Sequence, residues 1–155
     1  MYWSKPQRAD LMKRFFITVE YDGTGLVWMA TPKMRGTHLE QAAKALTGQD
    51  VIVQGSGRTD AGVHAYGQVA HLDVPEKFDE KAIMLGLNAK CKSRQIKVLE
   101  ARHVSDEMHA RFSATRRSYI YRILNRRIGT ALHRDFMYHV PYELDLDAMR
   151  AGAAH

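Results

Sequence analysis

Apolar residues recur at every second position in several short stretches of the chain, which is the period of a β-strand with one buried face. Over residues 15–21, Phe15, Ile17, Val19 and Tyr21 alternate with other side chains that face the opposite way. Similar stretches predict further strands over residues 51–54, 68–74, 96–104, 118–124 and 136–140. A sheet is therefore expected to form the main layer of the fold.

Helix signals stand between these strands. Thr37 and Glu40 have the spacing of a capping box, and Gly48 is placed to end the helix that follows. The apolar residues of this segment fall on one helical face, namely Leu39, Ala42, Ala43 and Leu46. Asp79 is placed to cap a second helix that stops near Asn88, and Asp145 to cap a third.

The order strand, helix, strand, strand, helix, strand, strand predicts an α+β domain with a mainly antiparallel sheet and helices on one face. Residues 1–11 are polar and without pattern, so we assign them to a loose N-terminal extension and residues 12–155 to one domain. Within that domain, residues 26–36 follow neither period, and Pro32 excludes a helix there.

The amino-acid composition indicates the kind of binding partner and the cellular compartment. The 155 residues include 23 lysines and arginines against 17 aspartates and glutamates, and the net charge of +6 favours a polyanionic partner. The single cysteine, Cys91, excludes an internal disulfide, which favours a reducing compartment. There is neither an apolar run of membrane-spanning length nor the apolar core of a signal peptide, so we expect a cytoplasmic protein without a membrane partner.

The first candidate for chemistry is the run Gly57-Arg58-Thr59-Asp60-Ala61-Gly62-Val63-His64, which follows an apolar stretch and is typical of a tight loop. It displays Asp60 between Arg58 and His64. A carboxylate held in this way can serve as a nucleophile or base, with Arg58 keeping it ionised, or can simply cap a turn. Spacing alone favours the turn cap, and we expect His64 to be a structural hydrogen-bond donor.

The second candidate is a basic segment over residues 111–127, which holds no acid. Its six arginines are Arg111, Arg116, Arg117, Arg122, Arg126 and Arg127. On the predicted strand, the rings of Tyr119 and Tyr121 share one face. Guanidinium groups bind phosphates and flat rings stack on bases, so the segment suits a single-stranded or flipped-out nucleotide. The alternative is a solvated edge strand.

Five motifs taken together resemble the TruA-type tRNA pseudouridine synthases. In the order of that family they are Glu20-Tyr-Asp-Gly-Thr24, the run from Gly57 to His64, Gly67-Gln-Val69, His109-Ala-Arg-Phe-Ser-Ala-Thr115 and Tyr119-Ile-Tyr121. The resemblance implies the ferredoxin-like half of a pseudouridine synthase fold. It also implies an isomerase that converts uridine to pseudouridine in the anticodon stem-loop of tRNA, without cofactor or metal, in a homodimer.

The resemblance also implies roles for individual residues. It places Asp60 on the family's catalytic nucleophile, Arg58 on the supporting basic residue beside it, and Tyr119 on the substrate-binding tyrosine. With the composition of the basic segment, it makes Arg111, Arg116 and Arg117 further candidates for binding the substrate.

The chain also departs from the family. Residues 26–32 replace a Gly-Trp-Gln segment, and the codons of Trp28 and Met29 allow the hypothesis of a one-base frameshift that is corrected before about Leu39. Residues 89–92 replace a Leu-Pro pair. The resemblance corresponds only to the family's N-terminal part, so we expect a chain truncated at its C-terminus. Three possibilities stay open: an isomerase acting through Asp60, a non-catalytic RNA-binding fragment, and a non-functional fragment that folds poorly.

Overall fold

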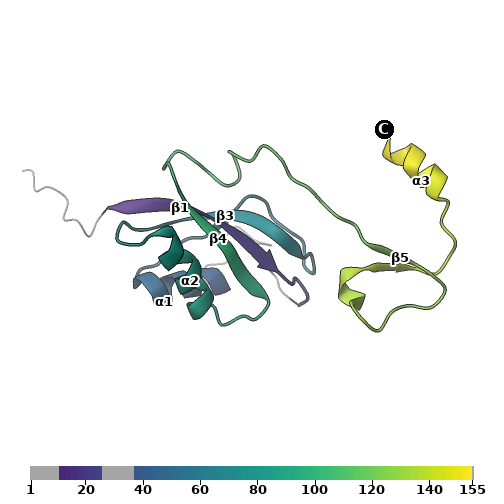
Figure 1. The fold of residues 1–155 in the computed structure, drawn as a ribbon, viewed down its shortest axis with the longest axis horizontal. Helices are drawn as coiled ribbons and strands as arrows, with labels where there is room; N and C mark the ends of the chain where they lie inside the picture. The colour runs from purple at the N-terminus through teal and green to yellow at the C-terminus, as the bar shows by residue number, and fades with distance from the viewer. Residues whose placement is uncertain (1–10, 26–36, 155) are drawn as a thin grey trace, which may run out of the picture. The chain divides into compact units, whose positions relative to one another are not determined.

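The computed structural model describes residues 11–25 and 37–154, which form two compact units divided between Arg116 and Arg117. Most of the predicted extension at residues 1–11, the predicted loop at 26–36 and the start of the hypothetical frameshift at Trp28 lie outside the described residues. The first unit holds a four-stranded sheet and two helices (Figure 1).

The sheet of the first unit is antiparallel throughout. Its strands are β1 (Met12–Tyr21), β2 (Gln54–Gly55), β3 (Ala65–Pro75) and β4 (Ile96–Val104). They follow the spatial order β2-β3-β1-β4, so β1 lies between β3 and β4. At the end of β1, Tyr21 pairs with Ala65 on one side and with Ile96 on the other. The prediction of a mainly antiparallel sheet is confirmed.

One face of this sheet carries the core. The alternating positions of β1 that the sequence pattern selected are buried, and so are Ala70, Leu72 and Val74 of β3. Helices α1 (His38–Thr47) and α2 (Glu80–Lys90) cover that face (Figure 1). Leu39, Ile83 and Leu87, with exposed fractions of at most 1%, fill the space between the layers. The expected α+β fold with helices on one face is confirmed.

The capping box predicted for α1 is confirmed, and the strand predicted after this helix is shorter than expected. Thr37 and Glu40 exchange the two expected hydrogen bonds, and Gly48 ends the helix in a left-handed conformation with φ of 79°. The other carboxylate oxygen of Glu40 accepts a hydrogen bond from the backbone N–H of Val53 at 3.2 Å. The ladder with β3 begins only at Gln54, so the strand predicted over residues 51–54 was wrong for residues 51–53 and is reduced to β2.

Helix α2 begins as predicted, since the side chain of Asp79 accepts a hydrogen bond from the backbone of Ala82. The predicted stop at Asn88 was wrong, because the helix continues to Lys90. The amide of Asn88 instead donates to the carbonyl of Val98 at 2.7 Å and accepts from its N–H at 3.0 Å. Asn88 therefore joins the helix to β4.

The second unit consists of short elements. Strand β5 (Ile123–Asn125) pairs in parallel with β6 (Tyr138–Val140), a 3₁₀ turn spans Arg134–Phe136, and helix α3 (Leu146–Ala153) begins at the predicted cap Asp145. The predicted strand over residues 118–124 was wrong for residues 118–122, since the ladder with β6 begins at Ile123, preceded by a hydrogen bond from the N–H of Tyr138 to the carbonyl of Arg122. The strand predicted over 136–140 is shortened because Phe136 belongs to the 3₁₀ turn.

Candidate functional site

The glycine-bounded run selected from the sequence forms a loop between β2 and β3. Its entry is fixed by the last contact of the sheet, in which the N–H of Ser56 donates to the carbonyl of Val69 at 2.8 Å. Its tip is a turn closed by a hydrogen bond of 3.2 Å from the N–H of Val63 to the carbonyl of Asp60. Gly62 in this turn has a φ of 86°, a conformation that favours glycine. The predicted tight loop is confirmed.

The side chains of Arg58 and Asp60 are exposed on this loop. Within the described residues neither side chain makes a hydrogen bond or an ion pair. The backbone carbonyl of Asp60, not its carboxylate, closes the turn. The carboxylate is therefore left open to solvent and to a substrate.

The buried hydroxyl group of Tyr21 fixes part of the candidate loop through hydrogen bonds. Tyr21 is 2% exposed, and its hydroxyl donates to Oε1 of Gln68 at 2.7 Å and lies 3.1 Å from Oγ1 of Thr59. Gln68 in turn donates through Nε2 to the carbonyl of Gly57 at 2.7 Å. Burial raises the pKa of Tyr21, although the Thr59 hydrogen bond opposes the shift, so the hydroxyl keeps its proton. These bonds fix the residues on both sides of Arg58.

The turn at residues 22–24 supports the far end of the same loop. Nδ1 of His64 lies 3.0 Å from the N–H of Gly23 and 3.0 Å from Oδ1 of Asp22. With its proton on Nε2 the ring accepts from Gly23, and with a proton on Nδ1 it donates to Asp22. Hydrogen bonds from Thr24 lower the pKa of Asp22, with a smaller contribution from His64. His64 therefore supports the 22–24 turn in either tautomer, as an acceptor toward Gly23 or as a donor toward Asp22.

Gly23 brings these two segments into direct contact. A Cβ atom at this position would lie 2.1 Å from the carbonyl oxygen of Val63, a distance that no side chain can occupy. The absence of a side chain at residue 23 therefore lets the backbone of the turn pack directly on the candidate loop.

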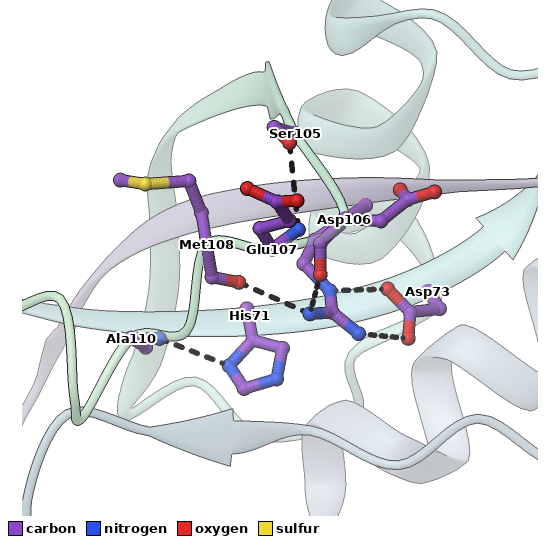
Figure 2. Close-up of polar contacts among 8 residues, drawn as sticks. His71, Asp73, Ser105, Asp106, Glu107, Met108 and Ala110 are labelled. Atoms are coloured by element: carbon purple, nitrogen blue, oxygen red, sulfur yellow. Dashed lines mark hydrogen bonds and ion pairs between the residues drawn. The ribbon is translucent and has the colours of Figure 1, made fainter.

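On the other face of the sheet, the segment of residues 105–113 is tied down by Arg14. The guanidinium group makes two hydrogen bonds of 2.7 Å to the carboxylate of Asp73 and also donates to the carbonyls of Asp106 and Met108. Figure 2 shows these contacts converging on one side chain. Because of the hydrogen bonds from Arg14, the pKa of Asp73 lies below its ordinary value. The bridge joins β1, β3 and the segment after β4.

His71 provides a second anchor for this segment. It is only 2% exposed, and its Nδ1 accepts a hydrogen bond from the N–H of Ala110 at 3.3 Å. Its ring contacts that of His109 with 4.4 Å between centroids, and the ring of His109 contacts Phe112 at 4.5 Å. Burial lowers the pKa of His71, and nearby His109 and Arg14 lower it further. Together the two anchors fix the backbone that carries Arg111.

The four residues predicted to bind the substrate are all exposed. Arg111 and Arg116 belong to the first unit, whereas Arg117 and Tyr119 belong to the second. Tyr119 has an exposed fraction of 71% and Tyr121 one of 88%, and neither lies in a strand. The prediction that the two rings share one strand face was therefore wrong.

Other features of the described residues offer no competing site. No group of three or more histidine, cysteine, aspartate or glutamate side chains gathers there in a way that would hold a metal ion. An open hollow of about 410 Å³, lined by residues that include Lys13, Phe15 and Lys81, lies at the start of β1, away from the candidate loop at its end. Across the described part of the chain, no helix combines the length and the apolar character needed to span a bilayer.

Comparison with known proteins gives one consistent result. A family model described as tRNA pseudouridine synthase matches residues 29–113, which include the candidate loop and the 105–113 segment. A tRNA pseudouridine synthase A from Bradyrhizobium diazoefficiens is 48% identical over 146 residues, which cover 92% of this chain and 59% of the relative. The protein of the same name from Caulobacter sp. strain K31 is 45% identical, with 92% of this chain and 58% of the relative covered.

The chain thus spans slightly less than three fifths of the length of these relatives. Within that span, the matched region takes in more than half of the chain and the identity lies well above the level at which a family relationship is secure. The chain belongs to the tRNA pseudouridine synthase family.

Proposed function

We propose that this protein isomerises uridine to pseudouridine in the anticodon stem-loop of tRNA, with Asp60 as the nucleophile. The observation that carries the proposal is the exposed Asp60 carboxylate on a loop whose backbone is fixed from two sides. A nucleophile must be accessible and must be carried on a backbone of fixed position, and Asp60 meets both conditions. Membership of the family supplies the class of substrate.

In the proposed reaction, the bond between ribose C1′ and uracil N1 breaks and a bond between C1′ and uracil C5 forms. The hydrogen at C5 leaves as a proton and N1 takes one up, so that the reaction is an isomerisation and needs no oxidant or reductant. Before this exchange the Asp60 carboxylate adds to C6 of the uracil ring, and that bond breaks again when the proton leaves C5, so the free carboxylate is regenerated. The uridine must first leave its stack, because its ring atoms are inaccessible inside a folded stem-loop.

Several exposed cations of the chain have the chemistry to bind the RNA. We assign Arg58 to support of Asp60 at the reacting nucleotide, and Arg111, Arg116 and Arg117 to the phosphates of the RNA backbone. Tyr119, with its exposed ring, is assigned to the target base, on which it can stack. We further propose a homodimer as the working form, on the basis of the family resemblance, and a cytoplasmic location, because the single cysteine favours a reducing compartment.

Trapping with a modified RNA tests the role of Asp60. In a stem-loop that contains 5-fluorouridine at the target position, C5 carries fluorine in place of hydrogen, so the step that releases a proton from C5 is blocked. We expect the protein to form a stable adduct that migrates slowly in a denaturing gel. The Asp60→Ala variant should bind the same RNA with unchanged affinity and form no adduct.

Two controls make the trapping result specific. Asp50→Ala removes another exposed carboxylate and should leave the adduct yield as it is. Adduct formation by Asp60→Ala at the yield of the unmodified protein would contradict the proposal. Binding of tRNA without any adduct in the unmodified protein would instead favour the non-catalytic RNA-binding function.

A further inference from the structure

The chain segment that follows α2 carries a group of cations, which we call the basic turn and define as Lys90, Lys92, Arg94 and Lys97. All four side chains are exposed, and no acid occurs in the sequence between Glu80 and Glu100. Within the described residues none of the four side chains makes an ion pair or a hydrogen bond. By contrast, the exposed side chain of Lys44 in the same unit is paired with Asp50 at 2.7 Å.

The basic turn lies at the same end of the sheet as the candidate loop. The last residue of β1, Tyr21, pairs with Ala65 at the start of β3 and with Ile96 at the start of β4. Neighbouring strands lie about 4.8 Å apart, so the exit of the loop and the end of the basic turn are separated by about 10 Å across β1.

Hydrogen bonds hold the two features in a fixed relation. The carbonyl of Gln95, inside the basic turn, accepts from the N–H of Asp22 at 2.9 Å, and its side-chain Nε2 donates to the carbonyl of Thr24 at 2.7 Å. The same residues 22–24 contact His64 and Val63 of the candidate loop. The 22–24 turn thus lies between the basic turn and the loop and contacts both.

Two acidic residues lie near the basic turn, and they leave most of its positive charge without a partner. Glu20 lies opposite Lys97 in the register of β1 and β4, so these two charges partly offset one another. The carboxylate of Asp22 is engaged by Thr24 and His64. Lys90, Lys92 and Arg94 have no such neighbour in the described structure, and their charges are available to an external anion.

We propose that the basic turn binds the sugar-phosphate backbone of tRNA beside the nucleotide that enters at Asp60. Unpaired lysine and arginine side chains bind phosphates without first having to break an internal ion pair, and each such interaction releases counterions from the RNA. The inference rests on the proposed function, since it takes Asp60 as the place where the target nucleotide enters. It adds a second RNA-binding surface, distinct from the arginines of residues 111–127.

A pair of charge-matched variants tests this surface. Lys92→Gln/Arg94→Gln removes two charges from the basic turn, whereas Lys77→Gln/Lys81→Gln removes two exposed charges from the opposite end of the sheet and of α2. Both variants have the same net charge, so their long-range attraction for RNA is altered alike. Any difference between them reports binding at the basic turn.

The measurement is the dissociation constant for unmodified tRNA at several salt concentrations. The slope of log affinity against log salt concentration is negative. Its magnitude should decrease by about 0.7 to 0.9 for each phosphate that is no longer neutralised, hence by about 1.4 to 1.8 in Lys92→Gln/Arg94→Gln. The Lys77→Gln/Lys81→Gln variant should keep the slope of the unmodified protein. Lys92→Arg/Arg94→Lys, which restores both charges, should restore the slope.

Equal slopes in the two Gln variants and in the unmodified protein would overturn the role of the basic turn and leave the proposed function standing. If the unmodified protein bound tRNA without salt dependence, or not at all, both proposals would fall. Thermal unfolding of each variant confirms that the substituted proteins are folded.

Discussion

At the scale of single residues, the candidate loop owes its position to a hydroxyl group that solvent does not reach. Tyr21 is buried beneath the loop and bonds Thr59 and Gln68, and Gln68 extends the connection to Gly57. The arrangement leaves the Asp60 carboxylate exposed while its neighbours in the chain are held. A carboxylate on a fixed backbone loses little freedom when a nucleotide binds, which favours reaction.

Removing the hydroxyl alone tests this positioning role. In Tyr21→Phe, Gln68 loses the donor to its Oε1 and Thr59 loses its partner, so we expect a loss of about 1 to 3 kcal/mol in the free energy of unfolding. If Tyr21 positions the loop, kcat of the proposed isomerisation should also fall severalfold while the KM for tRNA changes little. Urea denaturation and steady-state kinetics measure the two effects.

The matched control is Tyr142→Phe, which removes the hydroxyl of a tyrosine that is 77% exposed and should change neither quantity. A Tyr21→Phe protein with lowered stability and unchanged kcat would show that Tyr21 serves the fold and not the position of the loop.

At the scale of elements, local rules predicted the helices and the central strands, and interactions between residues distant in sequence decided the rest. The capping box at Thr37, the left-handed glycine at residue 48 and the cap at Asp145 are local signals, and each is where the sequence placed it. The alternation in residues 118–122 is equally regular, yet those residues form no strand. A strand needs a neighbour to receive its hydrogen bonds, and alternation says nothing about whether one exists.

The anchor at His71 is an element-scale feature with a pH dependence. Because burial lowers the pKa of His71 in the folded protein, the unfolded chain binds a proton more readily. Stability should therefore decline as the pH falls below about 6.5, the ordinary pKa of histidine, by at most about 1.4 kcal/mol per pH unit from this one group. His109, Arg14 and Asp73 face His71 and contribute to the shift.

Urea denaturation at pH 5 and pH 7.5 measures this effect, and both values lie well above the ordinary pKa of Asp73, so its carboxylate stays ionised. The His71→Gln variant keeps an acceptor for the N–H of Ala110 but does not titrate. It should lose less stability between the two pH values than the unmodified protein. An equal loss in both proteins would place the acid sensitivity elsewhere.

At the scale of the whole molecule, the order of motifs identified the family although no single motif was specific. The sequence identified Asp60 and Arg58 as candidate site residues because both lie within one short run. The hydrogen bonds that support the candidate loop and the 105–113 segment could not be predicted, because they join residues far apart in sequence, at a separation of 47 for Tyr21 and Gln68 and of 59 for Arg14 and Asp73. A net charge of +6 indicated an anionic partner but not where it binds, which depends on the pairing of each cation in the fold.

The most direct test of the central claim is the release of tritium from tRNA labelled at C5 of its uridines. Each isomerisation replaces the C5–H bond by a C5–C1′ bond and so releases one label to water. We predict that the unmodified protein releases label from the anticodon stem-loop and that Asp60→Asn, which keeps the shape of the side chain, releases none while binding tRNA normally. Release by Asp60→Asn at the rate of the unmodified protein would contradict the role of Asp60 as nucleophile.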